Sequence, residues 1–295
     1  MPRLYLGVDG GGTNCRVRLA DEHLNTLAET RKGRANLQIE NGDPGYQAIL
    51  EGTRELFSAA GLDYAETRNT YACFGMAGAR LESAREAFGT RPWPFGGVKV
   101  FDDIDIARAG AHGGEDGAVI IAGTGSAGLA LVDGVRHQCG GWGFEVGDQM
   151  SGAILGRELI RRAVEAEDGL VSGSPLTEAV IEMYGGNNDA VMDWSFQPGR
   201  APADWASCMP LFFTHYERGD PVANELMALE LSYVDNYVAW FQKRGAKKMA
   251  VVGGLADRLF PLLVQRYGDF MVERRGDPLD GALILARQLF PPSET

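Results

Sequence analysis

Apolar residues recur at every second position on both sides of a short glycine-rich segment near the start of the chain. Leu4, Leu6 and Val8 alternate with small or polar residues, and the alternation resumes from Cys15 to Leu19. A period of two is that of a β-strand with one buried face. The pattern therefore predicts a strand, a tight turn and a second strand.

The turn between these strands carries Asp9, then three glycines, then Thr13. A P-loop would end in Gly-Lys-Ser or Gly-Lys-Thr, and a dinucleotide fingerprint would have a third glycine where Cys15 stands and a helix after it. Neither pattern is present. Glycines let backbone N–H groups approach phosphate oxygens, and an aspartate beside them suits a hydrated Mg²⁺. We predict that Gly11, Gly12 and Thr13 bind phosphate and that Asp9 holds Mg²⁺ through water; an ordinary glycine-rich hairpin is the alternative.

The second half of the chain opens with the same design. Residues 118–122, the turn Gly123-Thr124-Gly125-Ser126 and residues 128–132 again give a strand, a glycine turn and a strand. A hairpin repeated at the start of each half predicts two duplicated α/β domains that face one another across a cleft, with a boundary at residues 112–115. The other expected elements are helices over 45–60, 104–111, 151–166, 175–184, 221–243 and from 277, strands over 71–78, 98–101 and 247–252, and a loop-rich interval over 185–202.

Composition narrows the possible partners. The 295 residues are 45% hydrophobic, which is typical of a globular protein, and the net charge of -12 disfavours nucleic acid and anionic membranes. No window approaches about 18 uninterrupted apolar residues, and no apolar signal region precedes the first strand, so we expect no membrane partner and a cytoplasmic location. The cysteines at 15, 73, 139 and 208 are too scattered for a zinc site or a disulfide framework. We expect buried thiols and no structural metal.

Three glycine turns at strand ends, at 10–13, 123–126 and 253–254, resemble in order and spacing the two phosphate motifs and the adenosine motif of the sugar kinase, actin and chaperone ATPase superfamily. The resemblance covers nearly the whole chain. It implies ribonuclease H-like (actin-like ATPase) domains: an N-terminal one over residues 1–113, on which a C-terminal helix at about 280–295 packs, and a C-terminal one over residues 114–280. ATP and Mg²⁺ are the implied cofactors. In this arrangement Gly123, Thr124 and Gly125 contact phosphates, and Gly253 and Gly254 lie under the base or ribose.

Within that superfamily the chain resembles the BadF/BadG/BcrA/BcrD-type ATPase family, and there its N-acetylglucosamine and glucosamine kinases. The matching pieces are residues 9–13, 35–36, 103, 123–126 and 140–149, of which the last is the most specific. The resemblance implies that Asp103 is the base that takes the proton of the sugar 6-hydroxyl as it attacks the γ-phosphate of ATP. Its rivals are Asp102 and Asp105, and the plain alternative for Asp103 is a helix N-cap.

The resemblance also implies that the substrate is a small amino sugar. It assigns sugar contacts to Asn36, Ser126, Gly141, Trp142 and Asp148. Asn36 could instead form a turn, and Trp142 could belong to the core. Ala127 and Gln149 depart from the animal N-acetylglucosamine kinase pattern, whereas Gly141-Trp142-Gly143 agrees with it, so glucosamine and N-acetylglucosamine both stay open.

Two other functions remain as alternatives. One is a BadF-type ATPase that activates a partner protein, although the scattered cysteines disfavour a shared iron–sulfur cluster. The other is a sugar sensor without catalysis, which the pair of Asp9 and Asp103 disfavours. A homodimer through the second domain is possible.

Overall fold

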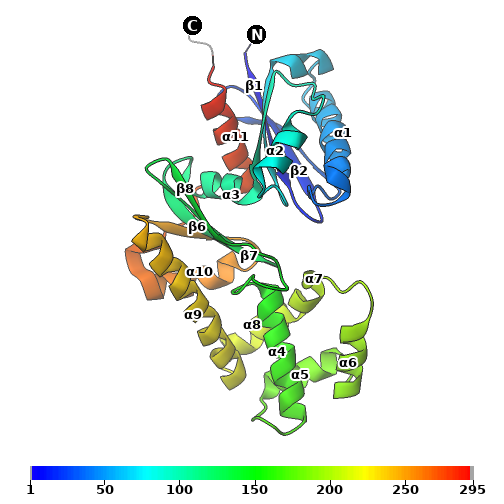
Figure 1. The fold of residues 1–295 in the computed structure, drawn as a ribbon, viewed down its shortest axis with the longest axis vertical. Helices are drawn as coiled ribbons and strands as arrows, with labels where there is room; N and C mark the ends of the chain where they lie inside the picture. The colour runs from blue at the N-terminus through cyan, green and yellow to red at the C-terminus, as the bar shows by residue number, and fades with distance from the viewer. Residues whose placement is uncertain (1, 293–295) are drawn as a thin grey trace. The chain divides into compact units, whose positions relative to one another are not determined.

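The computed structural model describes residues 2–292, which form two compact units (Figure 1). The first unit contains the residues up to Val119 and those from Glu273 onward, and the second runs from Ile120 to Val272. These limits differ by several residues from the expected domain limits at 113 and 280. The backbone N–H of Arg275 donates to the carbonyl of Ala111 at 3.0 Å. The segment before the last helix therefore packs with the first unit.

The first unit contains a five-stranded sheet in the order β3-β2-β1-β4-β5. In it β1 lies antiparallel to β2, with Val8 opposite Val17, and parallel to β4. The predicted strand-turn-strand hairpin is thus confirmed. The sequence pattern does not predict β3, the edge strand of this sheet, because its side chains are exposed or half-buried and form no apolar face. The strands are β1 (Leu4–Gly10), β2 (Cys15–Ala20), β3 (Thr26–Lys32), β4 (Thr70–Met76) and β5 (Gly97–Asp102).

Helices cover both faces of this sheet. One core combines alternate strand residues such as Val8 and Phe74 with Phe57 of α1, and the opposite core combines Tyr5 with Ile106. Because side chains alternate along β1, Asp9 lies on the same face as Tyr5. The helices of the first unit are α1 (Asp43–Ala59), α2 (Glu82–Gly89), α3 (Asp103–His112) and α11 (Pro278–Leu289), with 3₁₀ turns at Glu40–Gly42 and Tyr64–Asn69.

Helices α3 and α11 cross with their backbones in contact, and glycines make this possible. A Cβ on Gly281 would lie 1.9 Å from the carbonyl oxygen of Ile106, and one on Gly110 would lie 2.0 Å from that of Asp277. This crossing fixes Asp277, the N-cap of α11, whose side chain accepts the N–H of Asp280 at 2.9 Å. The first turn of α11 is thereby held beside β2.

The second unit has a four-stranded sheet in the order β8-β7-β6-β9 and a largely helical remainder. The interval 185–202, expected to be loop-rich, contains helix α6, so that prediction is wrong there. The side chain of Asn187 caps α6, and Val191 is its buried residue, which left little apolar periodicity to detect. The elements are β6 (Gly117–Ala122), β7 (Ser126–Val132), β8 (Val135–Gly140), β9 (Met249–Val252), α4 (Gly152–Glu167), α5 (Pro175–Met183), α6 (Asn188–Phe196), α7 (Pro202–Trp205), α8 (Met209–Glu217), α9 (Pro221–Lys243) and α10 (Ala256–Tyr267), with 3₁₀ turns at Ala206–Cys208 and Gly268–Phe270.

A carboxyl group interrupts the apolar stripe of α9. Glu230 is 4% exposed, and neither of its carboxyl oxygens has a hydrogen-bond partner among residues 2–292. Burial and the nearby charge of Glu158 on α4 raise the pKa of Glu230 to about 8. The backbone N–H of Met150 approaches the carboxyl group without completing a hydrogen bond and opposes the shift only in part. The fold therefore favours the protonated carboxyl group near neutral pH.

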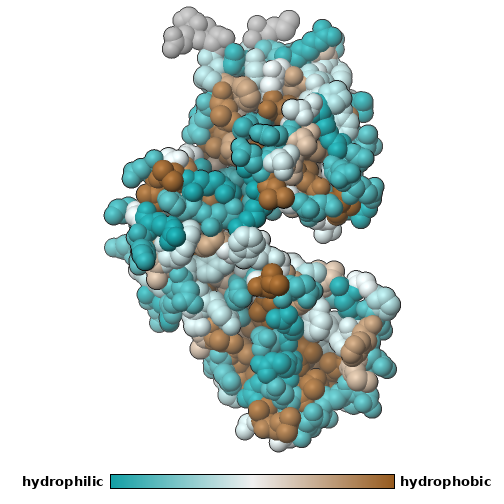
Figure 2. All heavy atoms as spheres, viewed as in Figure 1, coloured by the Kyte–Doolittle hydropathy of each residue, from teal (hydrophilic) through white to brown (hydrophobic). Residues whose placement is uncertain are grey.

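The surface is mainly polar. Figure 2 shows a mainly hydrophilic face on which hydrophobic residues form scattered patches. Among the described residues, no helix combines the length and apolar character that crossing a membrane requires. Cys15, Cys73 and Cys208 are buried as expected, but Cys139 is only half-buried, because it lies on the edge strand β8.

Candidate active site

The turn between β1 and β2 forms an open, polar hollow of about 330 Å³. The N–H of Gly11 donates to the carbonyl of Asn14 at 2.8 Å and closes the turn. Gly12 and Thr13 are exposed, and no atom lies within 4 Å of the place where a Cβ on Gly12 would stand. The backbone is thus open to a close ligand, as a phosphate site requires. The lining residues are Asp9, Gly11, Gly12, Thr13, Asn14, Arg16 and Arg31.

Asp9 lies in this hollow and is paired with Arg16. The guanidinium Nε and a terminal nitrogen both donate to the same carboxylate oxygen, Oδ2, at 3.1 and 2.8 Å. The side chain of Asp9 is 24% exposed, so its carboxylate remains accessible. The described residues contain no cluster of three metal-ligating side chains. One carboxylate beside a phosphate site fits a Mg²⁺ that keeps most of its water.

Arg16 and its neighbour on β2 connect this hollow to α11, a link that sequence reasoning missed. A terminal nitrogen of Arg16 donates to Asp277 at 3.0 Å, and Arg18 bonds both Asp277 and Asp280. The alternation along β2 could have placed both arginines on the face of Asp9. Their partners could not be found in this way, because they come from the far end of the chain.

Asp103 begins α3 directly after β5. The N-cap is Asp102, whose side chain makes no capping bond, so the interpretation of Asp103 as the N-cap is wrong. Burial, Asp102 and Asp9 raise the pKa of Asp103 to about 7, although the N–H of Ile104 favours the ionised form. A carboxylate with a pKa near neutrality suits a general base.

The rival aspartates are placed less favourably for this role. Asp102 is only 5% exposed, whereas Asp103 is half-buried and therefore more accessible to a substrate. Asp105, in the first turn of α3, lies near the positive charge of Arg108 and the thiol of Cys73. Asp103 is therefore the strongest candidate of the three for the base.

Asn36 lies beside the glycine turn but also makes a local turn. The N–H of Ala35 donates to the carbonyl of Gly11 at 2.8 Å, which anchors the segment. The side-chain oxygen of Asn36 accepts the N–H of Gln38 at 2.8 Å. The turn-forming alternative is confirmed in this sense, while the other end of the amide can still contact a ligand.

In the second unit, two of the predicted glycine turns lie together. The N–H of Leu255 donates to the carbonyl of Ala122 at 2.9 Å, immediately before Gly123. Gly253 has φ +103°, and a Cβ there would approach the Ala122 oxygen to 2.5 Å, so this position requires glycine. The N–H of Gly254 lies 3.6 Å from the position of a Cβ on Gly123. Thr124, Gly253 and Gly254 are all exposed.

Asp148 connects this turn with the loop that contains Trp142. It is 8% exposed and accepts the backbone N–H groups of Ser126 and Gly143. Its Oδ2 lies 2.9 Å from the position of a Cβ on Gly125, and burial raises its pKa. Ser126 in turn donates its hydroxyl to the carbonyl of Gln149. Ser126 and Asp148, both predicted to bind the sugar, therefore also hold the surrounding backbone through hydrogen bonds.

Trp142 is 63% exposed, so the interpretation of Trp142 as a core residue is wrong. Positive φ angles at Gly141 and Gly143, of +68° and +89°, turn the backbone on either side of it. The N–H of Gly141 donates to the carbonyl of Ser126 at 3.1 Å. The loop therefore holds the indole outward, where a ligand can stack on it.

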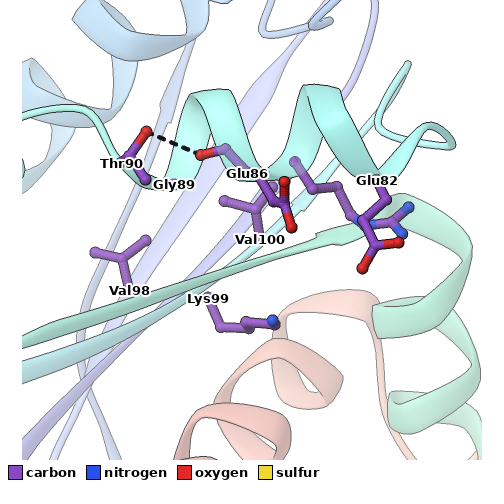
Figure 3. Close-up of a pocket in the computed structure, with 8 residues that line it drawn as sticks. Glu82, Glu86, Gly89, Thr90, Val98, Lys99 and Val100 are labelled. Atoms are coloured by element: carbon purple, nitrogen blue, oxygen red, sulfur yellow. Dashed lines mark hydrogen bonds between the residues drawn. The ribbon is translucent and has the colours of Figure 1, made fainter.

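A larger hollow of about 430 Å³ lies between α2 and β5, and none of the residues predicted for the site lines it. Figure 3 shows Glu82 and Glu86 on α2 beside Val98 and Val100 on β5. The hydroxyl of Thr90 donates to the carbonyl of Glu86 at 3.0 Å. Because of its mixed lining, we assign this hollow no ligand.

Comparison with known proteins adds to this geometry. The model of the BadF/BadG/BcrA/BcrD ATPase family matches residues 6–277. The chain is 30% identical over 282 residues to glucosamine kinase GspK of Vibrio cholerae, covering 96% of this chain and 95% of the relative. It is 24% identical to N-acetyl-D-glucosamine kinase of Dictyostelium discoideum over 312 residues, covering 96% and 97%.

Among solved structures, one similar fold is that of a Chromobacterium violaceum protein proposed to be an N-acetylglucosamine kinase. The TM-score is 0.86 at 32% identity, over 96% of this chain and 99% of the other. A glucokinase of the ROK family from Streptomyces griseus shares the fold at TM-score 0.57 and 19% identity, covering 97% and 99%. The predicted fold class is thus confirmed: an α/β chain with two sheets that matches sugar kinases of the actin-like ATPase fold.

Proposed function

Since the chain belongs to the BadF/BadG/BcrA/BcrD ATPase family, we propose that it is an ATP-dependent kinase that phosphorylates the 6-hydroxyl of glucosamine or N-acetylglucosamine. The observation that carries the proposal is Asp103, a carboxyl group whose raised pKa suits proton abstraction and which lies near the Asp9 phosphate turn. The names of the relatives support the amino-sugar class.

In this proposal the first unit performs the proton transfer. The carboxylate of Asp103 accepts the proton of the sugar 6-hydroxyl as that oxygen attacks the γ-phosphorus and the bond to the ADP oxygen breaks. The open backbone at Gly12 and Thr13 donates hydrogen bonds to phosphate oxygens. Gly11, whose own N–H closes the turn, lets the phosphate approach closely, and Asp9 would hold a hydrated Mg²⁺. When bound, Mg²⁺ supplies neutralising charge on the phosphates.

The second unit binds the remainder of the ligands in this proposal. Gly123, Thr124 and Gly125 contact phosphate, and the exposed pair Gly253 and Gly254 lies under the adenosine. The residues proposed to contact the sugar are Asn36, Ser126, Gly141, Trp142 and Asp148.

The environment of Asp148 bears on the choice between the two sugars. A free, ionised carboxylate would favour the cationic amine of glucosamine. Because Asp148 is buried and accepts two backbone N–H groups, it is a poor counter-ion for that amine. The exposed indole of Trp142 gives an apolar surface that suits an acetamide methyl group. These two features favour N-acetylglucosamine, whereas the relative at 30% identity is named a glucosamine kinase, so both amino sugars remain in the proposal.

The test is a coupled ADP-release assay with Mg-ATP and glucosamine, N-acetylglucosamine, glucose or no sugar. Release that depends on one amino sugar supports the kinase and identifies its substrate. Equal release in all four, including the control without sugar, contradicts the kinase and favours an ATPase that activates a partner protein.

A further inference from the structure

The hollow beside the glycine turn must accept a highly anionic ligand, if the proposed function is correct, on a chain with a net charge of -12. Positive charge near the turn is therefore needed. Arg16 is the nearest candidate, but Asp9 and Asp277 already neutralise it. A nucleotide phosphate that approaches Arg16 must compete with two carboxylates.

Arg31 differs from the other cations of its segment. Lys32 pairs with Glu55, and Arg34 pairs with Glu40. Arg31 lines the hollow, is exposed, and has no carboxylate partner among residues 2–292. It is the un-neutralised cation of the hollow.

The position of Arg31 is also fixed toward the turn. It stands directly opposite Arg16 in the pairing of β2 with β3, so both side chains lie on one face of the sheet. Its Nε donates to the side-chain oxygen of Asn14 at 3.0 Å, and Asn14 belongs to the glycine turn. The bond to Asn14 leaves the two terminal nitrogens for a ligand.

We propose that Arg31 is a phosphate-binding residue of this site, which donates its terminal N–H groups to the phosphate that the glycine turn receives. The inference rests on the proposed function, because it takes the turn as the phosphate site. The ligand is a phosphate group, either the terminal phosphates of the nucleotide or the 6-phosphate of the sugar product. A guanidinium suits it because its planar fork matches two phosphate oxygens.

The experiment measures dissociation constants by titration calorimetry for ATP, ADP, AMP and the 6-phosphates of both amino sugars, with and without Mg²⁺. The variants are Arg31→Ala and Arg31→Lys. Arg54→Ala is the matched control, since Arg54 is an exposed arginine of α1 outside the hollow. Arg31 is exposed, so its loss should not prevent folding, and thermal unfolding of each variant checks this.

We expect Arg31→Ala to weaken ATP binding by about 10- to 100-fold, the range for a lost charge-assisted hydrogen bond, and AMP by less than about twofold. Arg31→Lys should recover part of the loss, because it keeps the charge but not the fork. If the binding of ATP and of ADP weakens alike, the contact is on the β-phosphate. If the binding of ATP alone weakens, the contact is on the γ-phosphate. If the binding of a sugar 6-phosphate weakens, the contact is on the transferred phosphoryl group.

The inference is overturned if Arg31→Ala binds ATP, ADP and the sugar phosphates as tightly as the wild type does, or if Arg54→Ala weakens them equally. Absence of nucleotide binding by the wild type would overturn both the inference and the proposed function. If the wild type binds ATP through Arg31 but phosphorylates neither amino sugar, the proposed function alone fails.

Discussion

Replacing Glu230 with glutamine should make the second unit more stable at alkaline pH than the wild type. The carboxyl group is buried in α9 without a hydrogen-bond partner among the described residues, and its pKa is raised from 4.5 to about 8. Below pH 4.5 both folded and unfolded chains carry the proton, so the group adds no pH-dependent cost to folding. Between the two pKa values only the unfolded chain releases it, and folding is progressively disfavoured.

The size of the effect follows from the pKa difference. One pKa unit corresponds to about 1.4 kcal/mol, so stability attributable to Glu230 falls by up to about 1.4 kcal/mol per pH unit between the two values and levels off above the folded value. The glutamine variant has no proton to lose. From about pH 5 to about pH 8 it should gain roughly 2–4 kcal/mol over the wild type.

Urea unfolding followed by tryptophan fluorescence measures this difference. Four of the five tryptophans lie in the second unit, the exception being Trp93, so the signal reports mainly on the unit that contains Glu230. Glu51→Gln, an exposed change in the middle of α1, is the control and should follow the wild type at every pH. If Glu230→Gln and the wild type lose stability in parallel from about pH 5 to about pH 8, the carboxyl group is not protonated in the fold and the reasoning is refuted.

Three further changes test the site and the fold. Asp103→Asn should lower kcat by at least about 100-fold while the dissociation constant of ATP changes little. In the wild type, kcat/KM should fall as the pH drops below about 7, because protonation removes the base. An unchanged rate in the variant would assign the proton transfer to another residue. Asp148→Asn should destabilise the second unit by about 1–3 kcal/mol in urea unfolding, since one amide oxygen must replace a carboxylate that accepts two N–H groups. A variant as stable as the wild type would contradict the backbone contacts described for Asp148. Gly281→Ala should lower the stability of the first unit by about 2 kcal/mol, because the added Cβ would meet the carbonyl oxygen of Ile106. Gly33→Ala is the control and should change stability little, because a Cβ there meets no atom within 4 Å. Thermal unfolding compares the two variants.

The sequence predicted those parts of the fold in which one face is buried. Alternation revealed β1 and β2, and helical spacing revealed α4 and α9, because burial leaves a periodic apolar pattern. The edge strands β3 and β8 leave no such pattern, and α6 is held by its Asn187 cap and a single buried valine. Local burial, not local propensity, therefore set the limit of the prediction.

For the candidate site, the glycine turns were found from chain-local chemistry, since a turn needs only its own residues. The neighbours of Asp9 depend on tertiary structure: Arg16 bridges it to Asp277 across most of the chain. The scaffold role of Asp148 likewise depends on N–H groups from two loops that the fold brings together.

The crossing of α3 and α11 has a consequence for biosynthesis. The ribosome releases residues 120–272, a continuous unit, before it releases α11, so the second unit can fold while the first still lacks its last helix. At typical elongation rates, the synthesis of the residues from Ile120 to the end of α11 takes on the order of ten seconds. During that time the face that includes Tyr5, Cys73 and Ile106 lacks the α11 residues that pack on it, so the nascent first unit exposes apolar surface until α11 is made.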